Sequence, residues 1–117
     1  MRIIVATIVF LGALTGSAFA HALLDHASPR VGSTVMPSPQ EVVLWFTEKL
    51  ELAFSAIEVR SEQGAAMQTG KATVSGDRTQ LRVPLKALPP GRYKVIWRVM
   101  SVDTHRTQGD FSFRVGP

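Results

Sequence analysis

Two side chains near the end of the chain have types and a spacing that suit joint binding of a metal ion. Asp103 and His105 are separated by a single residue. On an extended segment, residues i and i+2 project from the same face, so the carboxylate and the imidazole would point the same way. Taken alone, however, this triplet is more typical of a polar strand end or loop whose side chains are solvated. A further ligand is needed to make a metal site the better interpretation.

The first twenty residues predict that export of the protein creates a further ligand. Met1–Arg2 is a short positive start, Ile3–Leu14 is an apolar run of 12 residues, and Ala18-Phe19-Ala20 ends in small residues. This order is typical of a cleavable export signal, so we expect residues 1–20 to be a signal peptide. The apolar run is shorter than the roughly 20 residues of a membrane-spanning helix. A cut after Ala22 also fits the cleavage pattern, but it would discard His21.

Cleavage after Ala20 makes His21 the first residue of the mature protein. An N-terminal histidine offers its α-amine and its imidazole Nδ1 to one ion, and the amine loses its proton readily because its pKa is only about 8. Together with His105 and Asp103, the donor set becomes three nitrogens and one oxygen. A tetragonal set of this kind favours Cu(II). Zinc, held by two imidazoles and a carboxylate, is the main alternative.

The third histidine, His26, is expected to lie apart from this set. If residues 21–27 are extended, His21, Leu23 and Asp25 share one face and His26 takes the other. Five residues of strand span roughly 16 Å, which is too far for a shared ion. We therefore interpret His26 as a surface residue, with a secondary or bridging metal role as the alternative.

Short stretches of alternating hydrophobicity predict the framework that positions these side chains. Besides His21–Ser28, strands are expected at Glu41–Phe46, Ser55–Arg60, Lys71–Ser75, Thr79–Leu85, Gly91–Met100 and through Phe111, Phe113 and Val115. No window shows convincing helical periodicity. About seven short strands predict one all-β domain over residues 21–117, a small Greek-key, Ig-like β-sandwich or barrel. Trp45 and Trp97 fall on the strand stripes and are assigned to the core.

Composition excludes several classes of protein. The chain has 117 residues, no Cys and a formal net charge of +4. A TIM barrel or a doubly wound dinucleotide-binding domain needs a longer chain. Without Cys there are no disulfides, thiolate metal sites or iron–sulfur clusters. The basic residues are scattered singly with acids between them, which fits solvated strand faces better than a nucleic-acid-binding surface.

An ordered set of short motifs covers the whole predicted mature chain. They are His21-Ala22-Leu23-Leu24, Ser28-Pro29-x-x-Gly32-Ser33, Val43-Leu44-x-Phe46-Thr47-Glu48, Tyr93-x-Val95-x-Trp97-x-Val99-x-Ser101-x-Asp103-x-His105 and Gly109-x-Phe111-x-Phe113-x-Val115. Each motif is weak by itself. In this order they resemble the CopC copper-resistance family of periplasmic copper-binding proteins.

The resemblance implies a Greek-key β-sandwich that binds Cu(II) through the α-amine and imidazole of His21, the carboxylate of Asp103 and the imidazole of His105. Glu48 occupies a position near that site in the family, where it would support a ligand or bind the ion weakly along its axis. Otherwise Glu48 is an exposed residue at a strand end. Some members also bind Cu(I) in a methionine-rich loop. The corresponding segment here, Ser61–Gly76, contains only Met67, so no Cu(I) site is expected.

The function implied is that of a monomeric periplasmic carrier or buffer of one Cu(II), rather than an enzyme. It would serve copper resistance, homeostasis or transfer to an inner-membrane copper transporter of the CopD type. Two alternatives stay open. One is a copper-dependent oxidative enzyme of the N-terminal-histidine type, similar to lytic polysaccharide monooxygenases. The other is a metal-free Ig-like interaction module, which would follow from cleavage after Ala22.

Overall fold

The computed structural model describes residues 22–117. The predicted signal peptide, residues 1–20, and His21 lie outside the described residues. Within residues 22–117 the regular elements are β-strands and one single-turn 3₁₀ helix, η2 (Leu52–Phe54). The prediction of an all-β domain is therefore confirmed.

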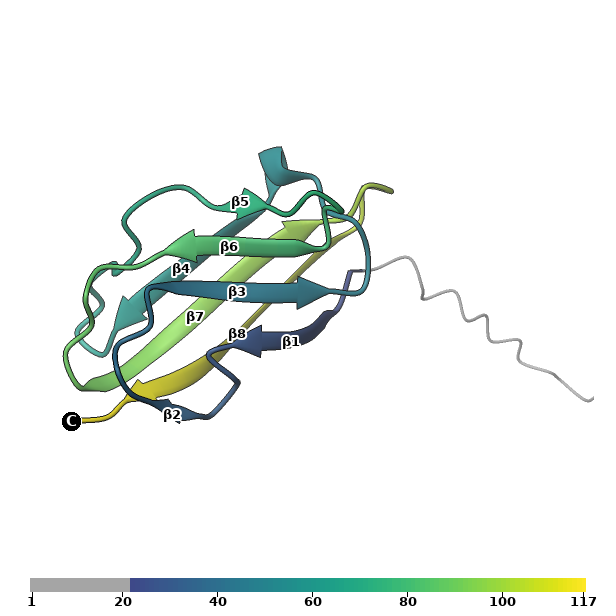
Figure 1. The fold of residues 1–117 in the computed structure, drawn as a ribbon. Helices are drawn as coiled ribbons and strands as arrows, with labels where there is room; N and C mark the ends of the chain where they lie inside the picture. Colours follow the sequence, from purple (N-terminus) through teal and green to yellow (C-terminus); the bar gives the residue numbers. More distant parts are fainter. Residues whose placement is uncertain (1–21) are drawn as a thin grey trace, which may run out of the picture.

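Two four-stranded sheets form the layers of a sandwich (Figure 1). The first sheet has the order β1 (Leu24–Ser28), β3 (Glu41–Phe46), β6 (Gln80–Pro84) and β5 (Thr73–Val74). The second has the order β2 (Thr34–Val35), β8 (Arg106–Val115), β7 (Gly91–Met100) and β4 (Ala56–Ser61). Neighbouring strands are antiparallel, except that β2 runs parallel to β8. The chain crosses repeatedly between the two layers, as in a Greek-key sandwich.

The core lies between the sheets because their strands alternate in hydrophobicity. In β7, every second residue from Tyr93 to Val99 is buried, and the residues between them are exposed or half-buried. The facing strand β3 contributes Val42, Leu44 and Phe46 to the same interior. An alternating strand covers one face of its sheet with apolar side chains and leaves the other to solvent.

Trp97 joins both layers close to the middle of β7. Its ring meets the ring of Phe46 edge-on, with centroids 5.2 Å apart. Its register partner on β8 is Gly109, where a Cβ atom would lie only 2.6 Å from Cζ2 of Trp97. The indole of Trp97 therefore occupies the space that any side chain at position 109 would fill. This packing fixes β7 against β8 below the turn that joins them.

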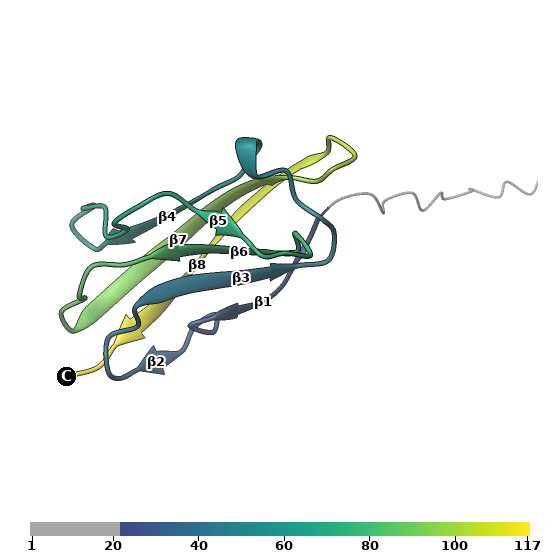
Figure 2. The same cartoon turned by 45° about the horizontal axis from the view of Figure 1, so that its top comes forward.

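The β7–β8 hairpin positions the candidate site. The two strands pair without interruption from Gly91↔Val115 to Met100↔Arg106. The turn between them, residues 101–105, lies at the same end of the sandwich as the start of β1 and the end of β3 (Figure 1 and Figure 2). Segments that are far apart in the sequence therefore meet around this turn.

The observed strands differ most from the expected ones in three places, one of which is that β8 begins at Arg106, five residues before Phe111, where the sequence predicts its strand. The sequence predicts a connecting loop between Gly32 and Pro39, but β2 lies within it and pairs with β8, which gives eight strands in the described chain instead of about seven. A two-residue strand is too short to show a period of two. The strand expected at Lys71–Ser75 is limited to the two residues of β5.

Candidate metal centre

Asp103 and His105 lie side by side in the turn between β7 and β8. Oδ1 of Asp103 is 3.2 Å from Nδ1 of His105, and both side chains are close to half exposed. The extended geometry that the sequence predicts for this segment is wrong, because Thr104 adopts the left-handed conformation with a φ of 73°. A tight turn, not a strand, brings the carboxylate and the imidazole together.

Ser101 holds this turn from its buried side. It is 1% exposed, and its Oγ donates a hydrogen bond to Oδ1 of Asp103. Its backbone N–H donates to the carbonyl of His105 at 2.9 Å, and its own carbonyl accepts from the N–H of Thr104 at 2.8 Å. A buried serine therefore orients the carboxylate. In the sequence, the signal for Ser101 is its place in the motif that ends at His105, two residues before Asp103 and at the end of an alternating strand.

The pKa of Asp103 is held below its usual value. The hydrogen bond from Ser101 is the largest cause and the imidazole of His105 adds to it, whereas desolvation acts in the opposite direction. Hydrogen bonds donated to a carboxylate favour its charged form. Asp103 is therefore ionised at neutral pH, and no proton has to leave it before it binds a cation.

The start of the described chain is anchored beside the same turn. Ala22 is fully buried, and its carbonyl accepts a hydrogen bond of 2.7 Å from Oγ1 of Thr107, which lies in β8 two residues after His105. The N–H of Leu23 donates to Oγ1 of Thr47 at 3.0 Å, and the N–H of Thr47 donates back to the carbonyl of Leu23 at 2.9 Å. The backbone at Ala22 is thus fixed to both sheets at the end that carries the turn.

Glu48 lies in the loop after β3, between two anchored residues. On one side Thr47 is bonded to Leu23, and on the other the carbonyl of Lys49 accepts a hydrogen bond of 3.0 Å from the N–H of Val102. Glu48 itself is half-buried. The loop therefore connects the anchored start of the chain with the β7–β8 turn, and Glu48 lies in this loop.

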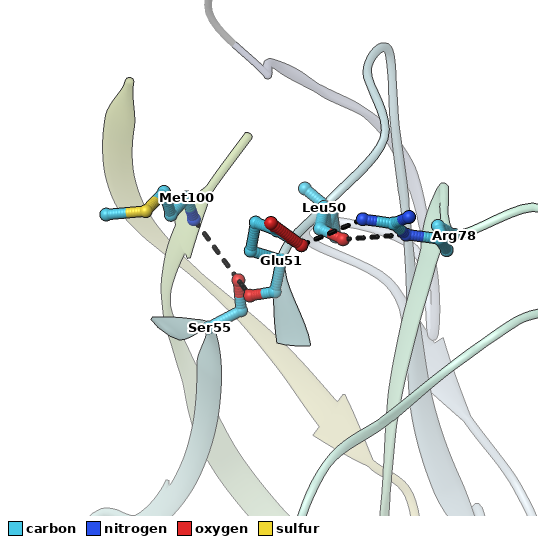
Figure 3. Close-up of polar contacts among 5 residues, drawn as sticks. All are labelled: Leu50, Glu51, Ser55, Arg78 and Met100. Carbon is cyan, nitrogen blue, oxygen red and sulfur yellow. Dashed lines mark hydrogen bonds and ion pairs between the residues drawn. The ribbon is translucent and has the colours of Figure 1, made fainter. Parts of the chain in front are cut away.

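A polar network fixes the next part of this loop (Figure 3). Arg78 donates from Nη2 to Oε1 of Glu51 at 2.8 Å and from Nε to the carbonyl of Leu50 at 3.4 Å. Ser55 donates from Oγ to the carbonyl of Glu51 at 2.9 Å and accepts from the N–H of Met100 at 3.1 Å. Because Met100 is the last residue of β7, the network ties this loop and η2 to the strand that leads into the turn.

His26 lies apart from the turn, in β1 beside β3. Its ring stacks on that of Trp45, with centroids 4.3 Å apart, and its Nδ1 is 2.7 Å from Oδ2 of Asp25. A β-bulge between Leu24 and His26 interrupts the alternation, so Asp25 and His26 are both exposed. The expectation that these two residues take opposite faces is wrong, and the expectation of a surface position for His26 is confirmed.

Asp103 and His105 do not form a complete metal site by themselves. In residues 22–117, no three side chains of His, Asp, Glu or Cys lie close enough to hold a metal ion. The pair supplies one oxygen and one nitrogen donor, and the other predicted ligand, His21, lies outside the described residues. Met67 packs against the core and Met36 is 66% exposed near Gly116. These thioethers lie on separate parts of the described chain.

The fold and the turn define a small β-sandwich that presents a carboxylate and an imidazole at one end. A model of the CopC domain matches residues 24–116, and the chain therefore belongs to the CopC family. Membership confirms the resemblance stated from the motifs and gives the chain a copper-related function. It also confirms that the protein is not an enzyme, since proteins of this family bind or transport copper.

Named relatives and a solved structure agree with this assignment. Protein YobA of Escherichia coli K12 is 38% identical over 87% of this chain and 84% of its own length. Copper resistance protein C of Xanthomonas campestris pv. juglandis is 37% identical over 97% of this chain and 96% of its own length. The crystal structure of CopC from Methylosinus trichosporium OB3b superposes with a TM-score of 0.77 at 33% identity, covering 83% of this chain and 95% of that one.

A longer relative contains a similar segment. The copper transport protein CutJ of Bacillus subtilis is 32% identical over 93% of this chain but over only 20% of its own length. A domain like this one is thus joined to a much larger protein named for copper transport. Among the described residues of the present chain, no helix has the length and apolar character required to cross a membrane.

Proposed function

We propose that the exported protein begins at His21 and binds one Cu(II) through four donors. These are the α-amine and imidazole of His21, the carboxylate of Asp103 and the imidazole of His105. The observation that carries the proposal is the Asp103–His105 pair, held by Ser101 beside the point where the described chain begins.

Covalent geometry supports the first ligand. Ala22 is fixed by the hydrogen bond between its carbonyl and Thr107, and consecutive Cα atoms of a trans peptide are 3.80 Å apart. Residue 21 is therefore bonded to Ala22, which is anchored to Thr107 in β8, two residues after His105. A signal peptide that ends at Ala20 would leave the amine of His21 free at this end of the sandwich.

The donor set suits Cu(II) better than zinc or Cu(I). Three nitrogens and one oxygen, two of the nitrogens from a single chelating residue, fit the tetragonal arrangement that Cu(II) prefers. Asp103 is ionised at neutral pH, and Ser101 and His105 lower its pKa further. Soft sulfur donors favour Cu(I), but Met36 and Met67 lie away from this turn and Met100, the last residue of β7, is a single thioether beside it, so residues 22–117 place no cluster of sulfur donors there. Glu48, at the same end, is available to bind the ion weakly or to orient a ligand.

The role that follows is a periplasmic Cu(II) carrier or buffer that supports copper resistance or homeostasis. The family relationship and the predicted signal peptide support a periplasmic location. The match to a segment of CutJ supports transfer of the ion to an inner-membrane copper transporter of the CopD type, because a similar domain is part of a protein named for copper transport. Hand-off requires an exposed ion, and the half-exposed side chains of Asp103 and His105 meet that need.

Two histidine variants test the site. His105→Ala removes a proposed nitrogen ligand and should weaken Cu(II) binding by orders of magnitude in competition with a chelator of known strength. His26→Ala is the matched control, because His26 is an exposed histidine that lies in β1, away from the turn. Equal losses in both variants, or a larger loss for His26→Ala, would refute the proposed ligand set.

A further inference from the structure

The outer face of the second sheet carries a concentration of positive charge. The basic residues of β4, β7 and β8 occupy strand positions that alternate with the buried or half-buried positions facing the core, so their side chains point away from it. We call this set the basic face: Arg60, Arg92, Lys94, Arg98, Arg106 and Arg114. The acidic residues on the same strand positions are Glu58 and Asp110, so positive charge predominates.

The strand register places like charges directly opposite one another on the basic face. Arg92 is the register partner of Arg114, and Arg60 is the partner of Lys94. Like charges in directly opposed positions destabilise a sheet. Of these four, only Arg60 has an acidic side chain within ion-pair distance in the described chain, Glu58 at 3.2 Å. A partner that brings negative charge to this face would remove the repulsion.

Apolar side chains protrude at the edge of the basic face. Leu52 and Phe54 lie on η2, where they are 41% and 62% exposed, and η2 has no buried residue. Phe54 lines a shallow hollow of about 340 Å³ together with Arg98 and Arg106. These apolar groups therefore stand beside two cations, although the network around Ser55 and Glu51 fixes η2 firmly to β7.

We propose that the basic face docks on a bilayer surface of anionic phospholipid, with Phe54 and Leu52 entering the boundary between headgroups and acyl chains. Cations next to exposed aromatic and aliphatic side chains are the pattern of proteins that lie in this boundary. A broad sheet face with cations distributed over three strands fits a flat layer of phosphates. A nucleic acid would match the charges but would leave Phe54 without an apolar environment.

Docking in this way would bring the candidate metal centre to the membrane. Arg106 directly follows His105 in the sequence, and Val102, in the same turn as Asp103, is 42% exposed. The turn would then lie at the rim of the contact and stay accessible to a membrane-embedded partner. This inference does not depend on copper binding, so the two are tested separately.

Vesicle binding tests the inference. The exported protein, shown by intact mass to begin at His21, is sedimented without copper with vesicles of phosphatidylethanolamine and phosphatidylglycerol, and with vesicles of phosphatidylcholine. We expect binding to the first that weakens with salt, and little binding to the second. Lys94→Gln/Arg98→Gln should lower the partition coefficient about fivefold for each cation removed. Phe54→Ser should lower it on the order of tenfold.

Matched variants on other surfaces complete the test. Arg82→Gln/Lys86→Gln removes the same charge from β6 and the residues after it, and Val31→Ser removes an equally exposed apolar side chain (60% exposed) from a turn beside the far end of β8. Both should bind like the parent, and circular dichroism checks that every variant is folded. Three results with vesicles would each overturn the proposal: no binding to anionic vesicles, equal binding to both vesicle types, or equal losses in the matched variants. Salt-sensitive binding of an acidic protein by this face, without binding to vesicles, would also overturn it.

Discussion

Replacement of Ser101 by alanine tests whether a buried hydroxyl prepares the metal centre. Ser101 is 1% exposed and its Oγ donates to the Asp103 carboxylate. The backbone hydrogen bond from its N–H to the carbonyl of His105 does not involve the side chain. Ser101→Ala should therefore keep this backbone bond while it frees the carboxylate, and the only contact with His105 that it removes is the long hydrogen bond of 3.4 Å from Oγ to the His105 carbonyl.

The expected size of the effect follows from the surroundings of Asp103. Loss of a group that orients a metal ligand costs 10–100-fold in metal affinity. Here the lower end applies, since Asp103 is 42% exposed in its side chain and still lies 3.2 Å from the imidazole of His105, so water and the imidazole replace part of the lost bond. We expect Cu(II) affinity to fall about tenfold. The pKa of Asp103 should rise toward its usual value, because the largest cause of its lowering is gone.

Two measurements on the same variant check this reasoning. A chelator competition gives the Cu(II) affinity, and a carboxyl titration of the copper-free protein by NMR gives the pKa of Asp103. Ser112→Ala makes the same chemical change in β8, far from the turn, and should alter neither quantity. Unchanged affinity together with an unchanged pKa of Asp103 would show that Ser101 does not orient the carboxylate.

Four further predictions follow from other parts of the molecule. One extra residue before His21 removes the free chelating amine, so Cu(II) affinity in a competition titration should fall by orders of magnitude while circular dichroism is unchanged; equal affinity would exclude the amine as a ligand. Asp77→Asn removes a charge whose pKa is lowered mainly by the hydrogen bond from Ser75, so in pH-dependent thermal unfolding the variant should be less stable at pH 7, with a difference that disappears as pH falls well below about 3.9; a loss that is independent of pH would contradict this. Gly109→Ala places a Cβ 2.6 Å from the Trp97 ring and should cost about 1–3 kcal/mol in urea unfolding; no loss would mean that the indole moves freely. Reduction should release copper, and Met67→Ala should not change anaerobic Cu(I) binding; tight Cu(I) binding that disappears in this variant would reveal a soft site.

Much of the framework could be predicted because local pattern and tertiary packing agree. Gly91–Met100 is the clearest case, since its apolar residues recur at every second position and the observed strand has the same bounds. Glu41–Phe46 is also correct, on its β-branched and aromatic content. In both, most side chains that satisfy strand preference also fill the core. The assignment of Trp45 to the core is wrong, because it is only half-buried and stacks on the exposed ring of His26.

Other features depend on contacts that a local pattern does not encode. The bulge at His26 and the pairing of β2 with β8 are decided by the partner strands, and nothing in the spacing of β1 signals them. The turn at Thr104 is similar: the spacing of Asp103 and His105 predicts their proximity, but a left-handed threonine is uncommon. The hydrogen bond from Thr107 to Ala22 spans most of the chain and could be found only in the folded structure.

The most direct test of the account is an electron paramagnetic resonance spectrum of the exported protein with one equivalent of Cu(II). The protein is purified without a tag, and its intact mass establishes that it begins at His21. The account predicts a single type 2 copper signal with nitrogen hyperfine structure, which is altered in His105→Ala and retained in His26→Ala. A spectrum of adventitious copper, or one that is the same in His105→Ala as in the parent, would contradict the proposed centre.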